Sequence, residues 1–101
     1  MVDFYREKIC GIFVWDAEKE KENIRKHGIS FEAAMGAFKD TGRRIYVDAK
    51  HSEQENRFFC LGKVEGKVLT VRFTYRDGRI RIIGAGNWRR GKVIYEKNKD
   101  L

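Results

Sequence analysis

Apolar and polar residues alternate along most of the second half of the chain, which is the pattern of strands with one buried face. Such runs occupy residues 43–47, 57–64, 67–76 and 79–83. Glu65-Gly66 and Asp77-Gly78 supply two-residue turns that join the last three runs into an antiparallel meander. An earlier apolar run, "GIFVW" at 11–15, predicts a further strand.

Three helices are predicted outside these strands. Asp16 stands at an N-cap position, and the charged segment after it continues to Gly28, a C-terminal stop. Ser30 can cap a second helix, "FEAAMGAFKD", and Asn87 a third, "WRRGKVIYEKNK". Gly91 weakens this last helix by about 1 kcal/mol relative to alanine. We therefore expect an α+β fold with a mostly antiparallel sheet of four to five strands, two N-terminal helices on one face and a C-terminal helix.

Length and composition bound the class of protein. A chain of 101 residues fits one domain, which we expect to span residues 1–101. No apolar run approaches the roughly 18 residues of a membrane span, and the charged N-terminus lacks the apolar stretch of a secretory signal. We therefore expect a cytoplasmic protein with no membrane partner. Cys10 and Cys60 have no metal-ligand spacing and are expected to be free, packed thiols, so neither a metal site nor a cofactor is predicted.

Positive charge is concentrated in the C-terminal half. Residues 1–55 hold ten Lys and Arg against eleven Asp and Glu, whereas residues 56–101 hold twelve against four. The net charge of +7 therefore comes entirely from the second half. Such asymmetry indicates a polyanion or an acidic protein as the partner.

The segment "VRFTYRDGRIRII", residues 71–83, is a predicted hairpin that carries four arginines. With Asp77-Gly78 as its turn, residue 76 opposes 79, and the pairing continues to residue 72 opposite 83. One face then holds Val71, Phe73, Tyr75, Ile80 and Ile82, and the open face holds Arg72, Thr74, Arg76, Arg79 and Arg81. Like charges directly opposite, as at Arg76 and Arg79, destabilise a sheet. The pattern therefore favours an anion-binding face over a merely solvated one, with RNA or DNA backbone as the ligand.

Such a face can also be catalytic. Attack of an RNA 2′-hydroxyl on the adjacent phosphorus needs a base, an acid and positive charge around the phosphorane, and it needs no metal. For proton transfer the chain offers several carboxylates and the side chains His27, His51, Lys26, Tyr75 and Tyr95. The sequence has no metal constellation, Ser/His/Asp arrangement or phosphate-binding glycine loop of the usual spacing. The residues alone thus indicate a basic sheet face for RNA or for an acidic partner.

A longer motif resembles a known family. W-D-x-x-K followed by N-x-x-K-H-G-I-S-F begins at Trp15 and ends at Phe31, and "NRFFCLG" and "RIRIIGAGNWRRGKVIYE" come later. These stretches resemble the BrnT toxins, small RelE-like ribonucleases of bacterial and archaeal toxin-antitoxin pairs, over roughly residues 13–96. The resemblance implies a RelE-like α+β fold, metal-independent RNA cleavage that halts translation, and neutralisation by a BrnA-type antitoxin. Contact with DNA would then come only through the antitoxin.

The resemblance also implies site residues. The family's E-R-F motif falls on Asn56, Arg57 and Phe58, so that its glutamate is replaced by asparagine. The arginine after the third strand falls on Arg76, and that of I-R-I-I falls on Arg81. The resemblance therefore places Arg57, Arg76 and Arg81 at the scissile phosphate.

The S-A-R triplet common in the family is absent, because Gly84-Ala85-Gly86 stands in its place. If its arginine contacts phosphate, Arg89 or Arg90 replaces it or activity is reduced. The prediction for the site is completed by Lys26 or His27 for proton transfer, and by the RNA-binding residues Arg72, Arg79, Trp88, Arg89 and Arg90.

Other interpretations stay open. Trp15-Asp16 suits a core aromatic with an N-cap, His27 a helix C-terminus, Arg57 a partly buried structural arginine, and Trp88 a packing residue. The same arginines can hold RNA passively or dock an acidic antitoxin without any chemistry. A DNA-binding role is disfavoured, because no helix-turn-helix pattern appears and the basic residues lie on strands.

Overall fold

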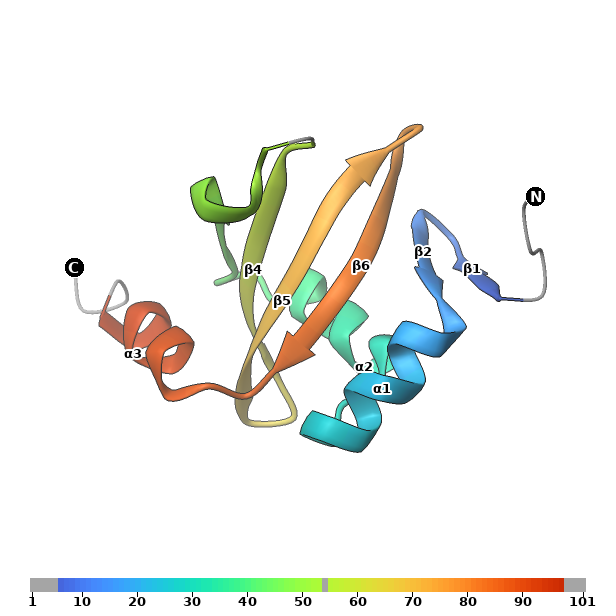
Figure 1. Ribbon diagram of the computed structural model, residues 1–101. Helices are drawn as coiled ribbons and strands as arrows, with labels where there is room; N and C mark the ends of the chain where they lie inside the picture. Colours follow the sequence, from blue (N-terminus) through green and yellow to red (C-terminus); the bar gives the residue numbers. More distant parts are fainter. Residues whose placement is uncertain (1–5, 54, 98–101) are drawn as a thin grey trace.

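The computed structural model, which describes residues 6–53 and 55–97, combines one sheet with three α-helices (Figure 1), so the predicted α+β class is confirmed. The strands are β1 (Glu7–Cys10), β2 (Phe13–Asp16), β3 (Arg44–Val47), β4 (Arg57–Val64), β5 (Lys67–Arg76) and β6 (Arg79–Gly86). The α-helices are α1 (Ala17–His27), α2 (Phe31–Met35) and α3 (Arg89–Lys97), with 3₁₀ helices η1 (Gly36–Lys39) and η2 (Ala49–His51). Among the described residues no helix is long and apolar enough to cross a membrane.

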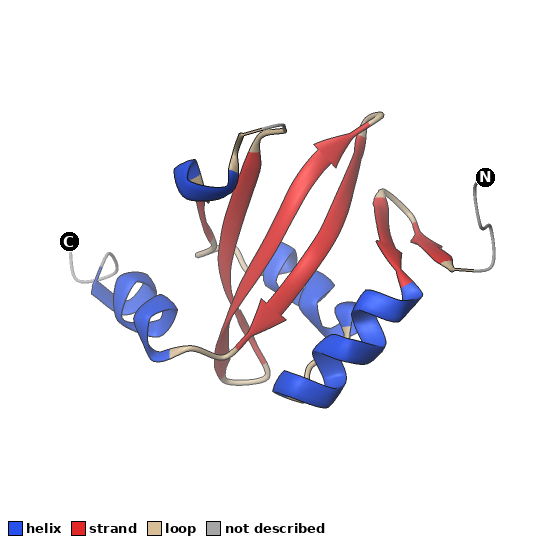
Figure 2. Ribbon diagram, viewed as in Figure 1, coloured by secondary structure: helices blue, strands red, loops and turns tan. Residues whose placement is uncertain are grey.

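The sheet is larger than predicted and is mixed (Figure 2). Its strand order is β1-β2-β6-β5-β4-β3, and β2 runs parallel to β6, with Phe13 opposite Ile80 and Val14 opposite Arg81. The expectation of four to five strands was wrong, because β1 lacks the apolar alternation by which a strand is recognised in a sequence. All four residues of β1 are exposed, and among the described strands it pairs with β2 alone. The meander of β4, β5 and β6 is antiparallel, as predicted.

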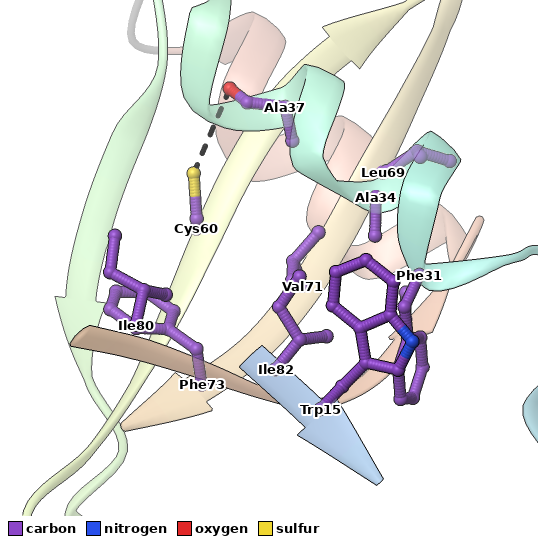
Figure 3. Close-up of a cluster of buried hydrophobic side chains, with 11 residues drawn as sticks. Trp15, Phe31, Ala34, Ala37, Cys60, Leu69, Val71, Phe73, Ile80 and Ile82 are labelled. Carbon is purple, nitrogen blue, oxygen red and sulfur yellow. Dashed lines mark hydrogen bonds between the residues drawn. The ribbon is translucent and has the colours of Figure 1, made fainter. Parts of the chain in front are cut away.

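The main core lies on one face of the meander (Figure 3). Val71 and Phe73 of β5 and Ile82 of β6 are buried there against Phe31 of α2 and Ala37 of η1. The predicted second helix is shorter as an α-helix, since the chain tightens to 3₁₀ after Met35. The thiol of Cys60 approaches the carbonyl oxygen of Ala37 to 3.8 Å at this place.

The opposite face carries α3, whose Tyr95 packs with Leu61 and Val68 in a second buried cluster. Gly91 is buried in this contact: a Cβ at Gly91 would lie 2.1 Å from Oγ1 of Thr70. The glycine that lowers helix propensity therefore lets α3 approach the sheet. The last two residues of the helix predicted over 88–99 lie outside the described residues.

The helix α1 meets the edge of β6 instead of lying flat on a sheet face. β2 ends at Asp16, after pairing only with the first residues of β6, and the edge of β6 at Ala85 is left without a neighbouring strand. The side chain of Asn23 on α1 forms hydrogen bonds with both backbone groups of Ala85. The prediction that the first two helices lie together on one face is therefore not confirmed.

The two cysteines differ. Cys60 is buried, and its burial raises the pKa of its thiol to about 12, so it is a packed thiol as expected. Cys10 is exposed at the end of β1, so the expectation that both thiols are packed was wrong for Cys10.

Candidate functional site

The hairpin of β5 and β6 carries most of the predicted site. Its register agrees with the prediction from the turn as far as Phe73 opposite Ile82, and Arg76 stands opposite Arg79. A β-bulge between Arg72 and Phe73 then shifts the pairing, so that Arg72 faces Gly84 and not residue 83. The prediction was wrong at that pair because a bulge depends on neighbouring strands and not on the turn.

The two faces of the hairpin follow the prediction with two exceptions. Val71, Phe73 and Ile82 are buried in the core, as expected. Tyr75 is 55% exposed, because it lies near the turn at the margin of the core, beside the rings of Phe58 and Phe73. Thr74 was placed on the open face but is 1% exposed, and its hydroxyl donates to the carbonyl oxygen of Asn56 at 2.7 Å.

Five arginines share the face opposite the main core, and we call this set the arginine face: Arg57, Arg72, Arg76, Arg79 and Arg81. The strand register aligns them, because Thr74 of β5 lies opposite Arg57 of β4 and also opposite Arg81 of β6. The pair Arg76 and Arg79 lies one step toward the turn, and Arg72 lies one step toward α3. The prediction that the four hairpin arginines, Arg72, Arg76, Arg79 and Arg81, share one face is confirmed, and Arg57 of β4 lies on the same face.

Glu55 lies between two of these arginines. Its carboxylate is 2.9 Å from a terminal nitrogen of Arg76 and 3.6 Å from one of Arg57. The hydrogen bond from Arg76, together with the charges of Arg76 and Arg57, holds the pKa of Glu55 below its ordinary value despite partial burial. Glu55 therefore brings a carboxylate to the site one position before Asn56, where the family's glutamate is replaced.

Three members of the arginine face carry a buried guanidinium nitrogen that the described part of the fold leaves unsatisfied. The Nε atoms of Arg57, Arg72 and Arg81 are buried and have no hydrogen-bond partner within residues 6–53 and 55–97. Arg81 forms an ion pair with Glu7 of β1, which leaves other donors of its fork unused. Buried donors without a partner are unusual in folded proteins, so hydrogen bonding around these three arginines is incomplete.

Two open hollows meet at Arg76. The larger, about 680 Å³, is lined by Lys50, His51, Glu53, Glu55, Arg57 and Arg76, and we call it the Arg76 hollow. The smaller, about 230 Å³, is lined by Glu7, Val14, Arg76, Asp77, Arg79 and Arg81. A chain that follows both hollows would pass along the arginine face between them.

The Arg76 hollow contains His51, which is not among the site residues that the sequence predicted. Nδ1 of His51 is 2.9 Å from Oδ2 of Asp48, whose side chain is 6% exposed. The sequence offered His51 only as one of several proton-transfer candidates. Its D-x-x-H spacing with Asp48, in a polar connection just before the Arg57 strand, was the available signal.

Lys26 and His27 lie elsewhere. They end α1, where Lys26 pairs with Glu22 at 3.4 Å and the His27 ring meets the Trp88 ring at a centroid distance of 5.1 Å. Trp88 comes two residues after Gly86, the last residue of β6, whereas Arg79 is the first residue of this strand. A strand of this length spans roughly 23 Å at 3.3 Å per residue. The structure therefore does not bring Lys26 and His27 to the Arg76 hollow.

The remaining predicted RNA contacts lie at the same end as Trp88. Arg89 and Arg90 begin α3 and are exposed. The ring of Trp88 covers Gly86, at which a Cβ would come within 2.4 Å of Cζ2 of the ring. The glycine that replaces the family's arginine thus makes room for Trp88.

The long motif at Trp15 to Phe31 is mainly structural. Asp16 caps α1 by accepting hydrogen bonds from the amides of Glu18 and Lys19, and Gly28 ends this helix in the left-handed conformation, as predicted. Ser30 caps α2. Trp15 is buried in the main core, which agrees with its interpretation as a core aromatic.

The residues that the structure describes hold no group of three or more His, Cys, Asp and Glu that could bind a metal ion. In comparisons with known proteins, a family model described as "Ribonuclease toxin, BrnT, of type II toxin-antitoxin system" matches residues 15–91. No curated protein matches the chain. The matched region includes every member of the arginine face and all lining residues of the two hollows apart from Glu7 and Val14.

Proposed function

The chain belongs to the BrnT family of ribonuclease toxins of type II toxin-antitoxin systems, and we propose that it cleaves RNA on the arginine face without a metal ion. RNA is its substrate class and an antitoxin its partner, as the family implies. The scissile phosphate would occupy the Arg76 hollow, between Arg57 and Arg76.

One observation carries this assignment: Arg57 and Arg76, from neighbouring strands, hold a single carboxylate between them beside an open hollow. Two guanidinium groups arranged around one oxyanion also suit a phosphate, which presents oxygens at similar spacing. Each guanidinium has five N–H donors, and Glu55 occupies only some of them. The position is thus open on its solvent side to a second anion.

The chemistry needs little more than this charge. The nucleophile, the 2′-hydroxyl, belongs to the RNA itself, so no metal is required to generate it. Arg57 and Arg76 would stabilise the extra negative charge of the phosphorane, which is where a preorganised cation lowers the barrier most. Arg81 would contact the neighbouring phosphate in the smaller hollow. The products would be a 2′,3′-cyclic phosphate and a 5′-hydroxyl end.

Other predicted residues would bind the RNA strand beyond the scissile position. Arg72 and Arg79 extend the arginine face in both directions along it. Trp88, Arg89 and Arg90 could hold a base and a phosphate at the far end of β6, where Lys26 and His27 also lie. That Lys26 or His27 transfers a proton stays a prediction.

The antitoxin would be of the BrnA type and would cover the arginine face, so that neutralisation and RNA binding compete for the same charges. We also propose that residues 1–101 act as one RelE-like domain in the cytoplasm. Contact with DNA would come only through the antitoxin.

The decisive experiment is incubation of the purified, antitoxin-free protein with total RNA, with and without EDTA, followed by mapping of the new RNA ends. We expect cleavage in EDTA, and its loss in the double variant Arg76→Ala/Arg81→Ala. Arg25→Ala is the matched control, because Arg25 lies on the outer surface of α1 and pairs with Glu22. Circular dichroism checks that each variant is folded.

Each result decides one part of the proposal. Cleavage that stops in EDTA would rule out metal independence. Cleavage that persists in the folded double variant would remove the arginine face from the site. RNA that is retained but left intact would identify a binding module without chemistry.

A further inference from the structure

The connection between β3 and β4 is anchored to the first residue of β4. The amide of Asp48 donates to the carbonyl oxygen of Arg57 at 2.7 Å. The hydroxyl of Ser52 donates to the carbonyl oxygen of Asp48 at 2.6 Å and accepts a hydrogen bond from the amide of Arg57 at 3.0 Å. These bonds fix the position of residues 48–52 relative to Arg57, so the side chains they carry are held at the Arg76 hollow.

His51 is oriented within this connection. Its Nδ1 lies 2.9 Å from Oδ2 of Asp48, and its side chain is 45% exposed where it lines the hollow. An ionised carboxylate only accepts hydrogen bonds, so Nδ1 must carry the proton and the lone pair of the neutral ring lies on Nε2. Over residues 6–53 and 55–97, Nε2 has no hydrogen-bond partner.

We propose that His51 is the general base of RNA cleavage and that Asp48 is its positioning residue. This inference rests on the proposed function. A histidine held by a buried carboxylate, with its second nitrogen facing a reacting group, is the arrangement that prepares an imidazole to take a proton.

The proposed step conserves atoms and charge. Nε2 of His51 takes the proton of the 2′-hydroxyl while the 2′-oxygen forms its bond to phosphorus. The bond from phosphorus to the 5′-oxygen breaks, and the leaving oxygen takes a proton from a water molecule in the open hollow. The protonated ring then returns its proton to solvent, so no water is consumed overall.

The other groups that face His51 are less suited to this role. They are Asp48, Lys50, Glu53, Glu55, Arg57 and Arg76. Glu55 is paired with both arginines, which keeps its pKa below the ordinary value and makes it a weak base. Asp48 is buried and already occupied by Nδ1. No hydrogen bond positions Lys50 or Glu53 within the described residues, whereas His51 is held by one.

The test uses an RNA oligonucleotide that carries one cleavage site mapped in total RNA. His51→Ala should lower the cleavage rate by about 100-fold or more, while retention of the oligonucleotide on a filter stays within a factor of about two. Added imidazole should restore part of the activity of His51→Ala, which a merely structural role would not allow. His51→Asn keeps a donor near the Nδ1 position but lacks Nε2, so it should be folded, inactive and not rescued.

Asp48→Asn and Arg25→Ala complete the series. Asp48→Asn should be slower than the wild type by a smaller factor than His51→Ala, because the imidazole stays but is no longer held by a carboxylate. Arg25→Ala should keep wild-type activity. Arg76→Ala removes one member of the arginine face and leaves His51 in place. It therefore tests the proposed function separately from the role of His51.

The outcomes are distinguishable. Wild-type cleavage in a folded His51→Asn variant, with loss in Arg76→Ala, would overturn the role of His51 and leave the proposed function standing. If His27→Ala abolishes cleavage while His51→Ala remains active, the residue that transfers the proton is His27 and not His51. Loss of both RNA retention and imidazole rescue in His51→Ala would make His51 a binding residue. Intact RNA with the wild-type protein would overturn both proposals.

Discussion

The side-chain amide of Asn23 takes the place of a neighbouring strand beside Ala85. Nδ2 donates to the carbonyl oxygen of Ala85 at 2.9 Å, and Oδ1 accepts from its amide at 3.1 Å. Nδ2 also donates to the carbonyl oxygen of Ile29 at 2.8 Å. One buried side chain thus joins α1, the connection to α2 and the open edge of β6, which positions the strand that carries Arg79 and Arg81.

Asn23→Ala should therefore be strongly destabilising. It leaves backbone groups of Ala85 and Ile29 without partners, and each such group costs about 1–3 kcal/mol when buried. We expect the free energy of unfolding to fall by about 2–4 kcal/mol in urea titrations. Asn56→Ala is the control, because Asn56 is exposed, and its effect should stay within about 0.5 kcal/mol. A loss below 1 kcal/mol at Asn23 would contradict this account.

Gly86→Arg would restore the arginine of the family's S-A-R triplet, and we expect it to be destabilising here. Its Cβ would meet the Trp88 ring at 2.4 Å, so the ring must leave Gly86 and its contact with His27. The expected loss is about 1–3 kcal/mol, as for other overpacked sites. It is measured by thermal unfolding, and a changed tryptophan fluorescence should accompany it.

Two further variants check the cause of that loss. Trp88→Ala in the Gly86→Arg background should recover stability. Gly84→Ser should cost little, because its Cβ would lie 3.3 Å from the movable end of Arg72. A Gly86→Arg protein as stable as the wild type would show that Trp88 does not hold this position in solution.

Gly91→Ala should also be destabilising, although helix propensity alone favours alanine by about 1 kcal/mol. The new Cβ would lie 2.1 Å from Oγ1 of Thr70, on the buried side of α3. We expect a net loss of about 1–3 kcal/mol in chemical denaturation. Thr70→Ala removes the obstructing oxygen, which has no hydrogen-bond partner among the described residues, so the double variant should be more stable than Gly91→Ala. Additive effects of the two changes would argue against this contact.

Asp16 should make stability depend on pH. Burial raises the pKa of its carboxyl, but the hydrogen bonds from the Lys19 and Glu18 amides and the charge of Arg6 outweigh this effect, and the pKa lies below its ordinary value of 3.8. A carboxyl with a lowered folded pKa stabilises the fold above the unfolded pKa and loses this effect as the pH falls through the folded value.

Asp16→Ala should therefore cost about 1 kcal/mol at pH 7, the usual effect of a lost N-cap. The difference from the wild type should shrink below about pH 4, as the carboxyl is protonated. Thermal unfolding between pH 7 and pH 2 measures both. Asp16→Asn is the control, because asparagine also caps helices but has no charge to lose. A difference between Asp16→Ala and the wild type that is independent of pH would exclude the charged cap.

Local rules explain why much of this protein could be predicted from its sequence. The turn at Asp77-Gly78 sets the pairing of the residues next to it, and alternation then assigns Arg76 and Arg81 to one face. The caps at Asp16, Gly28 and Ser30 depend on hydrogen bonds within a few residues, so they too can be predicted from the sequence. The arginine face follows from such short-range rules.

Other features of the protein depend on residues that are far apart in the chain and meet only in the folded molecule. The parallel pairing of β2 with β6, the position of α1 at Ala85 and the bulge at Arg72 depend on which strand edges remain open after the meander has formed. Which of the proton-transfer candidates lies at the arginine face also depends on contacts between distant parts of the chain. The sequence does not distinguish the histidine at position 27 from the one at position 51. Only the folded chain places His51 with Asp48 beside Arg57 and Arg76, while it leaves His27 against Trp88. Most of the helices and strands and the charged face of the hairpin thus follow from local geometry, whereas the set of residues that meets at the Arg76 hollow depends on long-range packing.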